Sequence, residues 1–359
     1  MSLVDTAKLN LGELFITGFD GLELGDETSA FISQSRVGGV LLFAKNYEKP
    51  EQVARLIQQI QECRTEFPLW ISVDQEGGRV QRFKAPFTIL PTGAAIGRTG
   101  SPKIAFEIAE VIAKELKAVG VNLNFCPVTD ILTNPTNPVI GDRAYGSNDE
   151  DVSKMATAMV RGHITIGVQP CVKHFPGHGD TSLDSHFALP KVETSLKDLQ
   201  EREFKPFLKA FKSRCNFVMT AHILNPNLDP EVPATLSSKV LQDILRKELR
   251  YNRIIISDDL EMQAITDHFG AEEAPLMALK AGCDLLIYRT EKAARHAYHS
   301  LSAALESGAL APETVLQAAE RSKALKKEVL MPYKTPDIAE ALKIIGCAEH
   351  QAIVEKVRE

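Results

Sequence analysis

The sequence lacks the features that mark several large classes of protein. Its six cysteines include no C-x-x-C pair, it has no run of basic residues, and its longest apolar stretch, residues 37–44, is interrupted by two glycines. A membrane-spanning helix needs roughly 20 apolar residues, and nucleic-acid binding domains usually carry a basic patch. The 41 basic and 47 acidic residues give a net charge of −6. We therefore expect no nucleic-acid partner and no membrane insertion.

Signals for export are also missing. The first residues, MSLVDTAKLNLGELF, contain no positively charged region followed by an apolar segment. A chain of 359 residues can bury a core without disulfides, so the scattered cysteines are expected to be reduced thiols. The composition, 44% hydrophobic and 25% charged, is typical of a globular enzyme and not of collagen, a coiled coil or a disordered chain. These observations favour a cytoplasmic protein.

Short apolar runs alternate with longer amphipathic segments along most of the chain. Eight runs are typical of strands buried on both faces of a parallel sheet. They are residues 14–19, 39–43, 69–73, 121–125, 169–172, 217–220, 253–257 and 284–288. Eight strand–helix alternations without a break in composition predict a (β/α)8 TIM-type barrel over residues 1–331 and a helical C-terminal appendage over 332–359. An open, doubly wound sheet would show the same periodicity and is the alternative fold.

The segments between these runs carry helix signals. In residues 101–120, Ser101 is a predicted N-cap, Pro102 a predicted first helical residue and Gly120 a predicted helix end. Segments 50–64 and 148–167 show the same apolar stripe. Further helices are expected near 194–213, 237–250, 271–281, 291–307 and 312–328.

Polar residues directly follow most of the predicted strands. They are Asp74–Arg79 with Arg82, then Asp130, Asp142-Arg143, Lys173-His174, His222, Asp258-Asp259 and Arg289. Because the carboxyl ends of all strands of a parallel barrel open on one face, we expect these residues to build a functional site there. Of two adjacent strand residues only one points inward, so one of Asp258 and Asp259 should face the site and the other should support a loop.

The densest cluster of ionisable residues is KHFPGHGDTSLDSH, residues 173–186. Its proline and glycines exclude a helix. Histidine and aspartate bind zinc or manganese, but the spacing does not match H-E-x-x-H, and Lys173 would repel a cation beside His174. The other interpretation is an acid/base loop, in which a carboxylate orients an imidazole and stabilises its charged form.

Two aspartate–histidine pairs in this loop could act as the general acid/base. They are Asp184/His186 and His178/Asp180. Local chemistry does not distinguish them, and both pairs stay open on the spacing alone.

Four segments together resemble glycoside hydrolase family 3, and more narrowly its bacterial β-N-acetylglucosaminidases of cell-wall recycling. They are VDQEGGRVQRF (73–83), GDRAYGSN (141–148), VKHFPGHGDTSLDSH (172–186) and IISDDLEM (255–262). Many members of this family add a second α/β domain that supplies the acid/base residue. This chain is similar to the single-domain branch, in which a histidine on a barrel loop performs that role.

The resemblance implies a role for each matching residue. Asp258 would be the nucleophile, and His186 the general acid/base with Asp184 as its partner. The residues implied to bind the sugar are Asp74, Arg82, Arg143, Lys173 and His174. The resemblance assigns His178 no catalytic role, and it implies neither a metal nor an organic cofactor.

The activity implied by the resemblance is that of a retaining exo-β-N-acetylglucosaminidase. Its substrate would be a muropeptide, with terminal GlcNAc linked β-1,4 to 1,6-anhydro-N-acetylmuramic acid, and its pathway peptidoglycan recycling. Two alternatives remain open. The chain could be a family 3 phosphorylase, in which phosphate replaces water, or a non-catalytic sugar-binding barrel. The sequence does not specify an oligomeric state.

Overall fold

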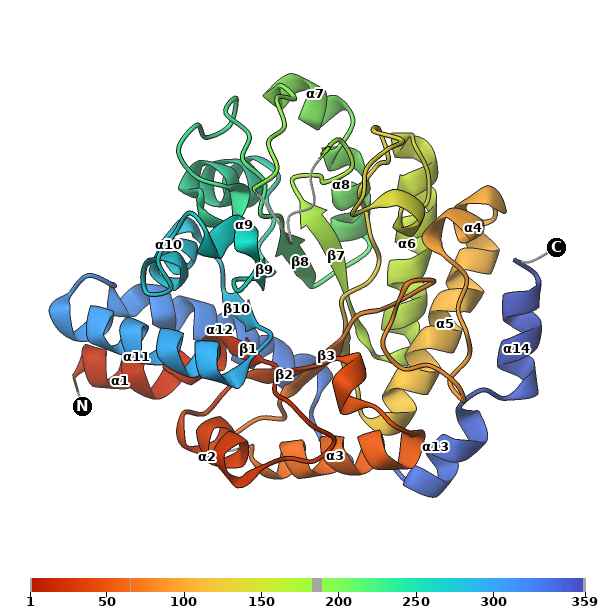
Figure 1. The fold of residues 1–359 in the computed structure, drawn as a ribbon, viewed down its shortest axis with the longest axis horizontal. Helices are drawn as coiled ribbons and strands as arrows, with labels where there is room; N and C mark the ends of the chain where they lie inside the picture. The colour runs from red at the N-terminus through yellow and green to blue at the C-terminus, as the bar shows by residue number, and fades with distance from the viewer. Residues whose placement is uncertain (1, 65, 183–188, 358–359) are drawn as a thin grey trace.

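The computed structural model describes residues 2–64, 66–182 and 189–357. In this part of the chain the main sheet is a closed barrel of eight parallel strands, in the order β1-β10-β9-β8-β7-β6-β3-β2 (Figure 1). The strands are β1 Phe15–Thr17, β2 Gly39–Leu42, β3 Trp70–Val73, β6 Leu123–Asn124, β7 Gln169–Phe175, β8 Phe217–Thr220, β9 Ile254–Asp259 and β10 Leu285–Tyr288. All eight predicted strands are confirmed, and closure of the sheet excludes the open alternative.

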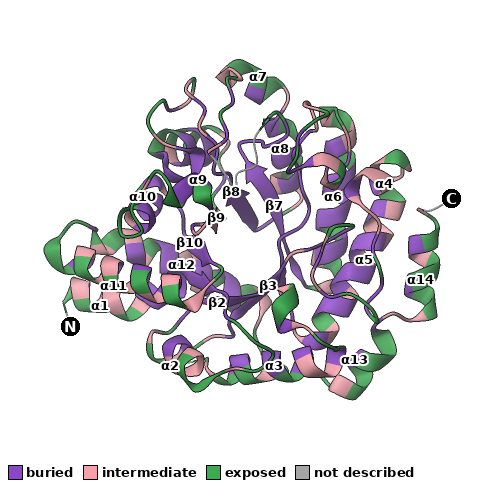
Figure 2. Ribbon diagram, viewed as in Figure 1, coloured by how far each residue is buried: buried purple, intermediate pink, exposed green. Residues whose placement is uncertain are grey.

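Helices surround the barrel with their inward faces buried, most of them against the barrel and the last two against other helices (Figure 2). They are α1 Leu3–Leu11, α2 Asp26–Gln34, α3 Pro50–Glu62, α4 Gly93–Arg98, α5 Pro102–Val119, α6 Asp149–Ile166, α7 Leu196–Glu201, α8 Phe204–Lys212, a π-helix Lys239–Glu248, α9 Gln263–Thr266, α10 Glu273–Ala281, α11 Glu291–Ser307, α12 Pro312–Val329, α13 Ile338–Ile344 and α14 Ala348–Glu355. The architecture is therefore a (β/α)8 TIM-type barrel.

The ends of α5 follow the predicted capping signals. The Ser101 side chain accepts a hydrogen bond from the backbone N–H of Ile104. Gly120 ends the helix in the left-handed region, with φ 100°, which a residue with a Cβ rarely adopts. One helix prediction needs correction, because the helix expected near 194–213 is divided into α7 and α8, which Arg202 and Glu203 separate.

Two strands continue beyond their predicted ends. The prediction ended β7 at Val172, but it runs through Phe175, which pairs with Thr220 of β8. Likewise β9 continues to Asp259, which pairs with Ile287 of β10. Strand pairing uses backbone groups, so polar side chains do not end a strand when they face a cavity and find partners there. Lys173, His174 and Asp258 accordingly lie on strands and not in loops.

The C-terminal helices α13 and α14 pack beside α5, and α13 also contacts α3 (Figure 1). A buried contact at hydrogen-bond distance joins the two parts, with Nδ1 of His350 2.7 Å from Oε1 of Glu115. Glu115 also accepts a hydrogen bond from the hydroxyl of Thr88. Glu115 thereby connects the C-terminal segment, through His350, to the loop that follows Arg82, through Thr88. The boundary at residue 331 stays a prediction.

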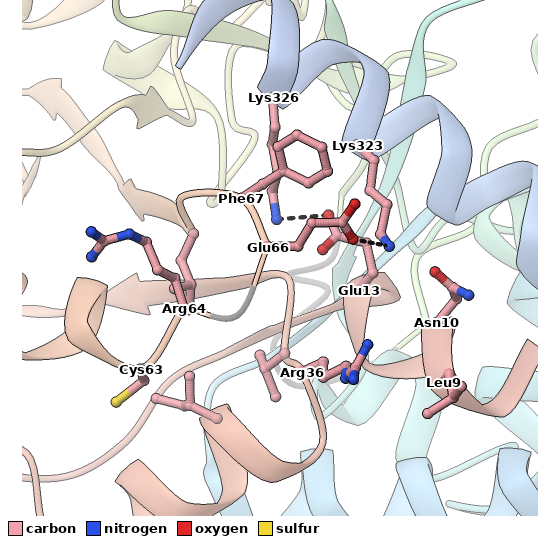
Figure 3. Close-up of a pocket in the computed structure, with 13 residues that line it drawn as sticks. Leu9, Asn10, Glu13, Arg36, Cys63, Arg64, Glu66, Phe67, Lys323 and Lys326 are labelled. Atoms are coloured by element: carbon pink, nitrogen blue, oxygen red, sulfur yellow. Dashed lines mark hydrogen bonds and ion pairs between the residues drawn. The ribbon is translucent and has the colours of Figure 1, made fainter. Parts of the chain in front are cut away.

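The amino ends of the strands are closed by a buried polar cluster (Figure 3). The ammonium group of Lys326 lies 2.6 Å from Oε1 of Glu13 and donates to the backbone carbonyl of Gly38 at 2.7 Å. The Ser322 hydroxyl donates to the same Glu13 oxygen and accepts from the indole N–H of Trp70. The adjoining cavity has a volume of about 20 Å³, far too small for a sugar. Among the described residues, no helix is long and apolar enough to cross a membrane.

Candidate functional site

A cavity of about 280 Å³ opens at the carboxyl ends of the strands. Six of the eight predicted site residues line it, namely Asp74, Arg82, Arg143, Lys173, His174 and Asp258. The other two, Asp184 and His186, lie outside the described residues. The polar residues that follow separate strands therefore converge on one site, as the barrel prediction required.

The period of two along each strand explains which side chains face this cavity. The barrel interior is filled by apolar side chains that include Cys171, Ile254 and Ile256. Lys173 comes two residues after Cys171, and Asp258 comes two residues after Ile256. Residues two apart on a strand point to the same face of the sheet. The side chains of Lys173 and Asp258 therefore point into the cavity, above the apolar side chains that fill the barrel interior.

A network of paired charges forms one side of the cavity. The ammonium group of Lys173 lies 2.8 Å from Oδ1 of Asp74 and 2.6 Å from Oε1 of Glu76. Arg143 donates to both carboxylate oxygens of Glu76, each at 2.8 Å. Arg82 lies 3.3 Å from the second oxygen of Asp74. The network joins Lys173 on β7 to side chains that follow β3 and β6 in the chain.

The network keeps its buried groups ionised. Burial opposes ionisation of both carboxyls, yet the adjacent cations hold the pKa of Asp74 and of Glu76 below their usual values. Burial also opposes the charge on Lys173, but the carboxylates of Asp74 and Glu76 raise its pKa. Fixed donors and acceptors of this kind suit the vicinal hydroxyls of a sugar, because they are oriented before the ligand binds.

The hairpin formed by β4 (Gln75–Gly77) and β5 (Val80–Gln81) positions Glu76 and Arg82. The buried amide oxygen of Gln75 accepts from the backbone N–H of Arg82 at 3.0 Å. Gly77 has φ 109°, and a Cβ added there would lie 2.2 Å from the carbonyl oxygen of Pro91. Only glycine fits at this turn, which carries the chain from the Asp74 side of the cavity to Arg82.

Asp130 anchors the segment that contains both His174 and His178. Its buried carboxylate lies 2.7 Å from Nδ1 of His174 and accepts the backbone N–H of His178 at 2.7 Å. Burial disfavours the charged form, but His174 keeps the pKa of Asp130 below its usual value. The His174 imidazole is therefore oriented by a buried carboxylate in the segment that follows β6.

The two acids at the end of β9 have different environments. Burial opposes ionisation of Asp258, but the nearby imidazoles of His174 and His222 hold its pKa below the usual value. Asp259 accepts the backbone N–H of Glu261 at 3.0 Å and lies 3.2 Å from Nε of Arg289. Burial raises the pKa of Asp259 to about 7. Asp258 is thus the ionised carboxylate of the pair, and Asp259 supports the following loop as expected of one of them.

The residues of the other aspartate–histidine pair have separate structural partners. Nδ1 of the buried His178 lies 2.8 Å from the Thr181 hydroxyl. Asp180 accepts hydrogen bonds from Thr133 and Thr194. Burial, reinforced by the nearby His174, lowers the pKa of His178 to about 4, so this imidazole is neutral near pH 7. These contacts favour a structural role for His178.

Other polar residues that the sequence placed after strands received no role, and four of them have defined partners at the site. Glu76, Asp130 and Arg289 have the contacts described above. His222 is held between the Thr235 hydroxyl at 2.8 Å and the backbone carbonyl of Asp259 at 2.9 Å. Their position directly after predicted strands was the signal for them, but their partners follow only from the closed barrel.

The family model for the glycosyl hydrolase family 3 N-terminal domain matches residues 6–325. The chain belongs to glycoside hydrolase family 3. It is 36% identical over 277 residues to the β-hexosaminidase of Idiomarina loihiensis, covering 76% of this chain and 82% of that protein. It is 39% identical to the β-hexosaminidase of Nitrosomonas eutropha, covering 74% and 78%. The resemblance found in the sequence is confirmed.

Solved structures of family 3 enzymes share this fold. A β-N-acetylglucosaminidase from Paenibacillus matches with a TM-score of 0.90 and 39% identity, over 98% of this chain and 68% of that one. NagZ from Neisseria gonorrhoeae, solved in complex with a zinc ion, matches with a TM-score of 0.80 and 28% identity, over 96% and 98%. The chain is therefore a glycoside hydrolase built on a TIM-type barrel.

Proposed function

We propose that this family 3 hydrolase is a retaining exo-β-N-acetylglucosaminidase. The observation that carries the proposal is the arrangement of the cavity, which ionised Asp258 on β9 shares with the network of fixed charges formed by Lys173 on β7 and by side chains that follow β3 and β6 in the chain. The β-hexosaminidase relatives support the same substrate class. The sugar would bind to the network with its anomeric carbon towards Asp258.

Asp258 would attack the anomeric carbon and form a covalent glycosyl-enzyme. A nucleophile must be ionised, and the imidazoles beside Asp258 favour its charged form. Asp74, Arg82, Arg143, Lys173 and His174 would bind the hydroxyls and acetamido group. Their paired charges fix the donors and acceptors before the sugar arrives.

His186 would protonate the leaving oxygen and then deprotonate the attacking water, with Asp184 orienting its ring. A reference pKa near 6.5 suits a group that gives and takes a proton near neutral pH. This assignment rests on the sequence motif.

The natural substrate we propose is a muropeptide carrying terminal GlcNAc on 1,6-anhydro-N-acetylmuramic acid. Its hydrolysis would serve peptidoglycan recycling in the cytoplasm. The motif resemblance to recycling enzymes and the similarity to NagZ support this part of the proposal.

The test compares p-nitrophenyl β-GlcNAc with the matching β-glucoside, each with and without inorganic phosphate. We expect a clear preference for the GlcNAc glycoside and release of free GlcNAc in the absence of phosphate. Release that requires phosphate and yields the sugar phosphate would show a phosphorylase. Sugar binding without turnover would show a non-catalytic barrel.

A further inference from the structure

Asn124 of β6 and His163 of α6 form a polar contact in a layer of the fold that is filled mainly by apolar side chains. Leu123 and Phe125 belong to the barrel interior, so the alternation along the strand directs Asn124 outward, towards the helices. His163 lies in the last turn of α6. Both side chains are fully buried. Burying polar groups costs free energy unless they are hydrogen-bonded, so their partners identify what the pair supports.

The side-chain amide of Asn124 pairs with both backbone polar groups of Gln75. Val73 is the last residue of β3, and its carbonyl accepts the backbone N–H of Phe125 at 2.9 Å. Beyond this point, Oδ1 of Asn124 accepts the backbone N–H of Gln75 at 3.0 Å, and Nδ2 donates to the carbonyl of Gln75 at 3.1 Å. The side chain of Asn124 therefore continues the pairing with the chain past the end of β3.

The imidazole of His163 holds the Asn124 amide from the other side. Its Nδ1 lies 2.8 Å from the backbone carbonyl of Met159, and its Nε2 lies 3.0 Å from Nδ2 of Asn124. A carbonyl can only accept, so Nδ1 carries the ring proton and Nε2 of the neutral ring accepts from Asn124. Burial lowers the pKa of His163 to about 4, so the ring is neutral near pH 7. The amide oxygen and both amide hydrogens of Asn124 thus have partners.

The two backbone groups held by Asn124 belong to the peptide planes on either side of Gln75. The N–H is part of the plane shared with Asp74, and the carbonyl is part of the plane shared with Glu76. Because each peptide plane is rigid, fixing both sets the directions in which the two acidic side chains leave the backbone. Their carboxylates lie 2.8 and 2.6 Å from Nζ of Lys173. The Asn124 amide is therefore one bonded step away from the charge network.

The side chain of Gln75 extends the same support to Arg82. Its Oε1 accepts the backbone N–H of Arg82 at 3.0 Å and that of Phe83 at 3.1 Å, and its Nε2 donates to the carbonyl of Phe83 at 2.9 Å. Gln75 is buried, so these hydrogen bonds are shielded from water. A chain of hydrogen bonds thus runs from His163 through Asn124 and Gln75 to the backbone that carries the network.

We propose that Asn124 is a positioning residue for sugar binding and that His163 supports its amide. Asn124 acts through Gln75, whose backbone and side chain hold the residues that surround Lys173 in the charge network. Asn124 and His163 are not among the described residues that line the cavity, so both act through other residues. This inference rests on the proposed function, in which the network binds the sugar.

The test is a double-mutant cycle on kcat/KM for p-nitrophenyl β-GlcNAc. Asn124→Leu replaces the amide with an uncharged group of nearly equal size, and it is measured alone and combined with Asp74→Asn. Alone it should lower kcat/KM by roughly 10- to 100-fold, since displacing a site by about 1 Å can cost about 100-fold. In the Asp74→Asn background the loss should be at least about threefold smaller, because the carboxylate that Asn124 positions is gone. A merely structural defect would lower kcat/KM by the same factor in both backgrounds.

Asn122 provides a matched control, two residues earlier in the chain. Its Oδ1 accepts the backbone N–H of Ile71 at 2.9 Å, and its Nδ2 donates to the carbonyl of Leu69 at 3.0 Å. Asn122 therefore makes the same kind of contact at the amino end of β3, away from the cavity. Both Asn122→Leu and Asn124→Leu should lower the melting temperature, because each leaves backbone groups unpaired. Asn122→Leu should leave kcat/KM unchanged with and without Asp74→Asn.

His163→Phe is the second variant, which keeps a ring but cannot accept from Asn124. It should lower kcat/KM less than Asn124→Leu does, because Gln75 still holds the amide, and this loss should also shrink in the Asp74→Asn background. Its cycle decides the outcome if Asn124→Leu does not fold.

Equal losses in the two backgrounds, or a wild-type kcat/KM in Asn124→Leu, would overturn the positioning role while leaving the proposed function intact. Absence of hydrolysis by the wild type would instead overturn the proposed function, and the positioning role with it.

Discussion

Asp130 fixes the orientation of the His174 ring, with its Oδ2 2.7 Å from Nδ1 of that imidazole. The same carboxylate accepts the backbone N–H of His174. Because Nδ1 donates to Asp130, the other ring nitrogen is the one that would bind the sugar in the proposed function. Asp130 thus determines the orientation of the His174 ring at the cavity.

Replacing Asp130 with Asn tests this relationship. The amide would present a donor to Nδ1 or leave it unpaired, so the favoured tautomer changes. We expect kcat/KM for p-nitrophenyl β-GlcNAc to fall by about 10- to 100-fold, the usual effect of losing the partner that orients a functional histidine. The pH profile should also change. A normal profile with only a lower melting temperature would indicate a merely structural role.

His186→Ala distinguishes the two aspartate–histidine pairs. Loss of a general acid should be severe for glycosides with poor leaving groups and milder for activated aryl glycosides, which depart with little protonation. The measurement is kcat/KM across a series of aryl β-GlcNAc substrates, with His178→Ala as the control. If His178→Ala alone shows the leaving-group dependence, the acid/base assignment is wrong.

Lys326→Met tests the buried ion pair at the amino end of the barrel. Removing the ammonium leaves Glu13 buried without its cation, which should cost about 3–5 kcal/mol of unfolding free energy. The double variant Lys326→Met, Glu13→Gln should recover most of this loss. Lys323→Met is the control, since its partner Glu66 is exposed and such pairs contribute less than about 1 kcal/mol. Chemical denaturation measures all four proteins, and equal losses in the two single lysine variants would contradict this account.

Glu203, at the start of α8, should make stability depend on pH. It is 3% exposed, and within the described residues its Oε2 has no hydrogen bond. Burial raises the pKa of Glu203 to about 7 from 4.5. The folded state therefore binds the proton more tightly than the unfolded state. The stability linked to this proton is fully present below pH 4.5, and it is lost as the pH rises through 7.

Glu203→Gln removes this titration. Relative to the variant, the wild type should lose up to about 3 kcal/mol of unfolding free energy between pH 4.5 and pH 8. Glu201→Gln, at a site whose side chain is 66% exposed, is the control and should follow the wild type. An identical pH dependence in wild type and Glu203→Gln would show that the carboxyl is not buried as described.

The alternation of apolar runs and helices was sufficient to predict the barrel. The period of two predicted that one of Asp258 and Asp259 faces the site, and the resemblance to family 3 identified it as Asp258. Ile254 and Ile256 face the barrel interior, and Asp258 continues their series. A local sequence pattern can predict which face of a strand a side chain lies on, because strand geometry repeats every two residues.

Pairings between distant residues could not be predicted in this way. Lys173 reaches Glu76 and Asp74 only because β7 and β3 both border the cavity, with β6 between them. Nothing in the sequence near Lys173 specifies which carboxylates it meets. The roles of Asp184 and His186 likewise remain predictions, since both lie outside the described residues.

The central claim is that Asp258 forms the covalent bond to the sugar. The most direct measurement is mass spectrometry of peptides after reaction with a fluorinated GlcNAc donor that forms the glycosyl-enzyme quickly and releases it slowly. We expect one added sugar per chain, on the peptide containing Asp258, and no labelling of Asp258→Asn. A sugar attached to a different carboxylate, or turnover of the reagent with no trapped adduct, would contradict it.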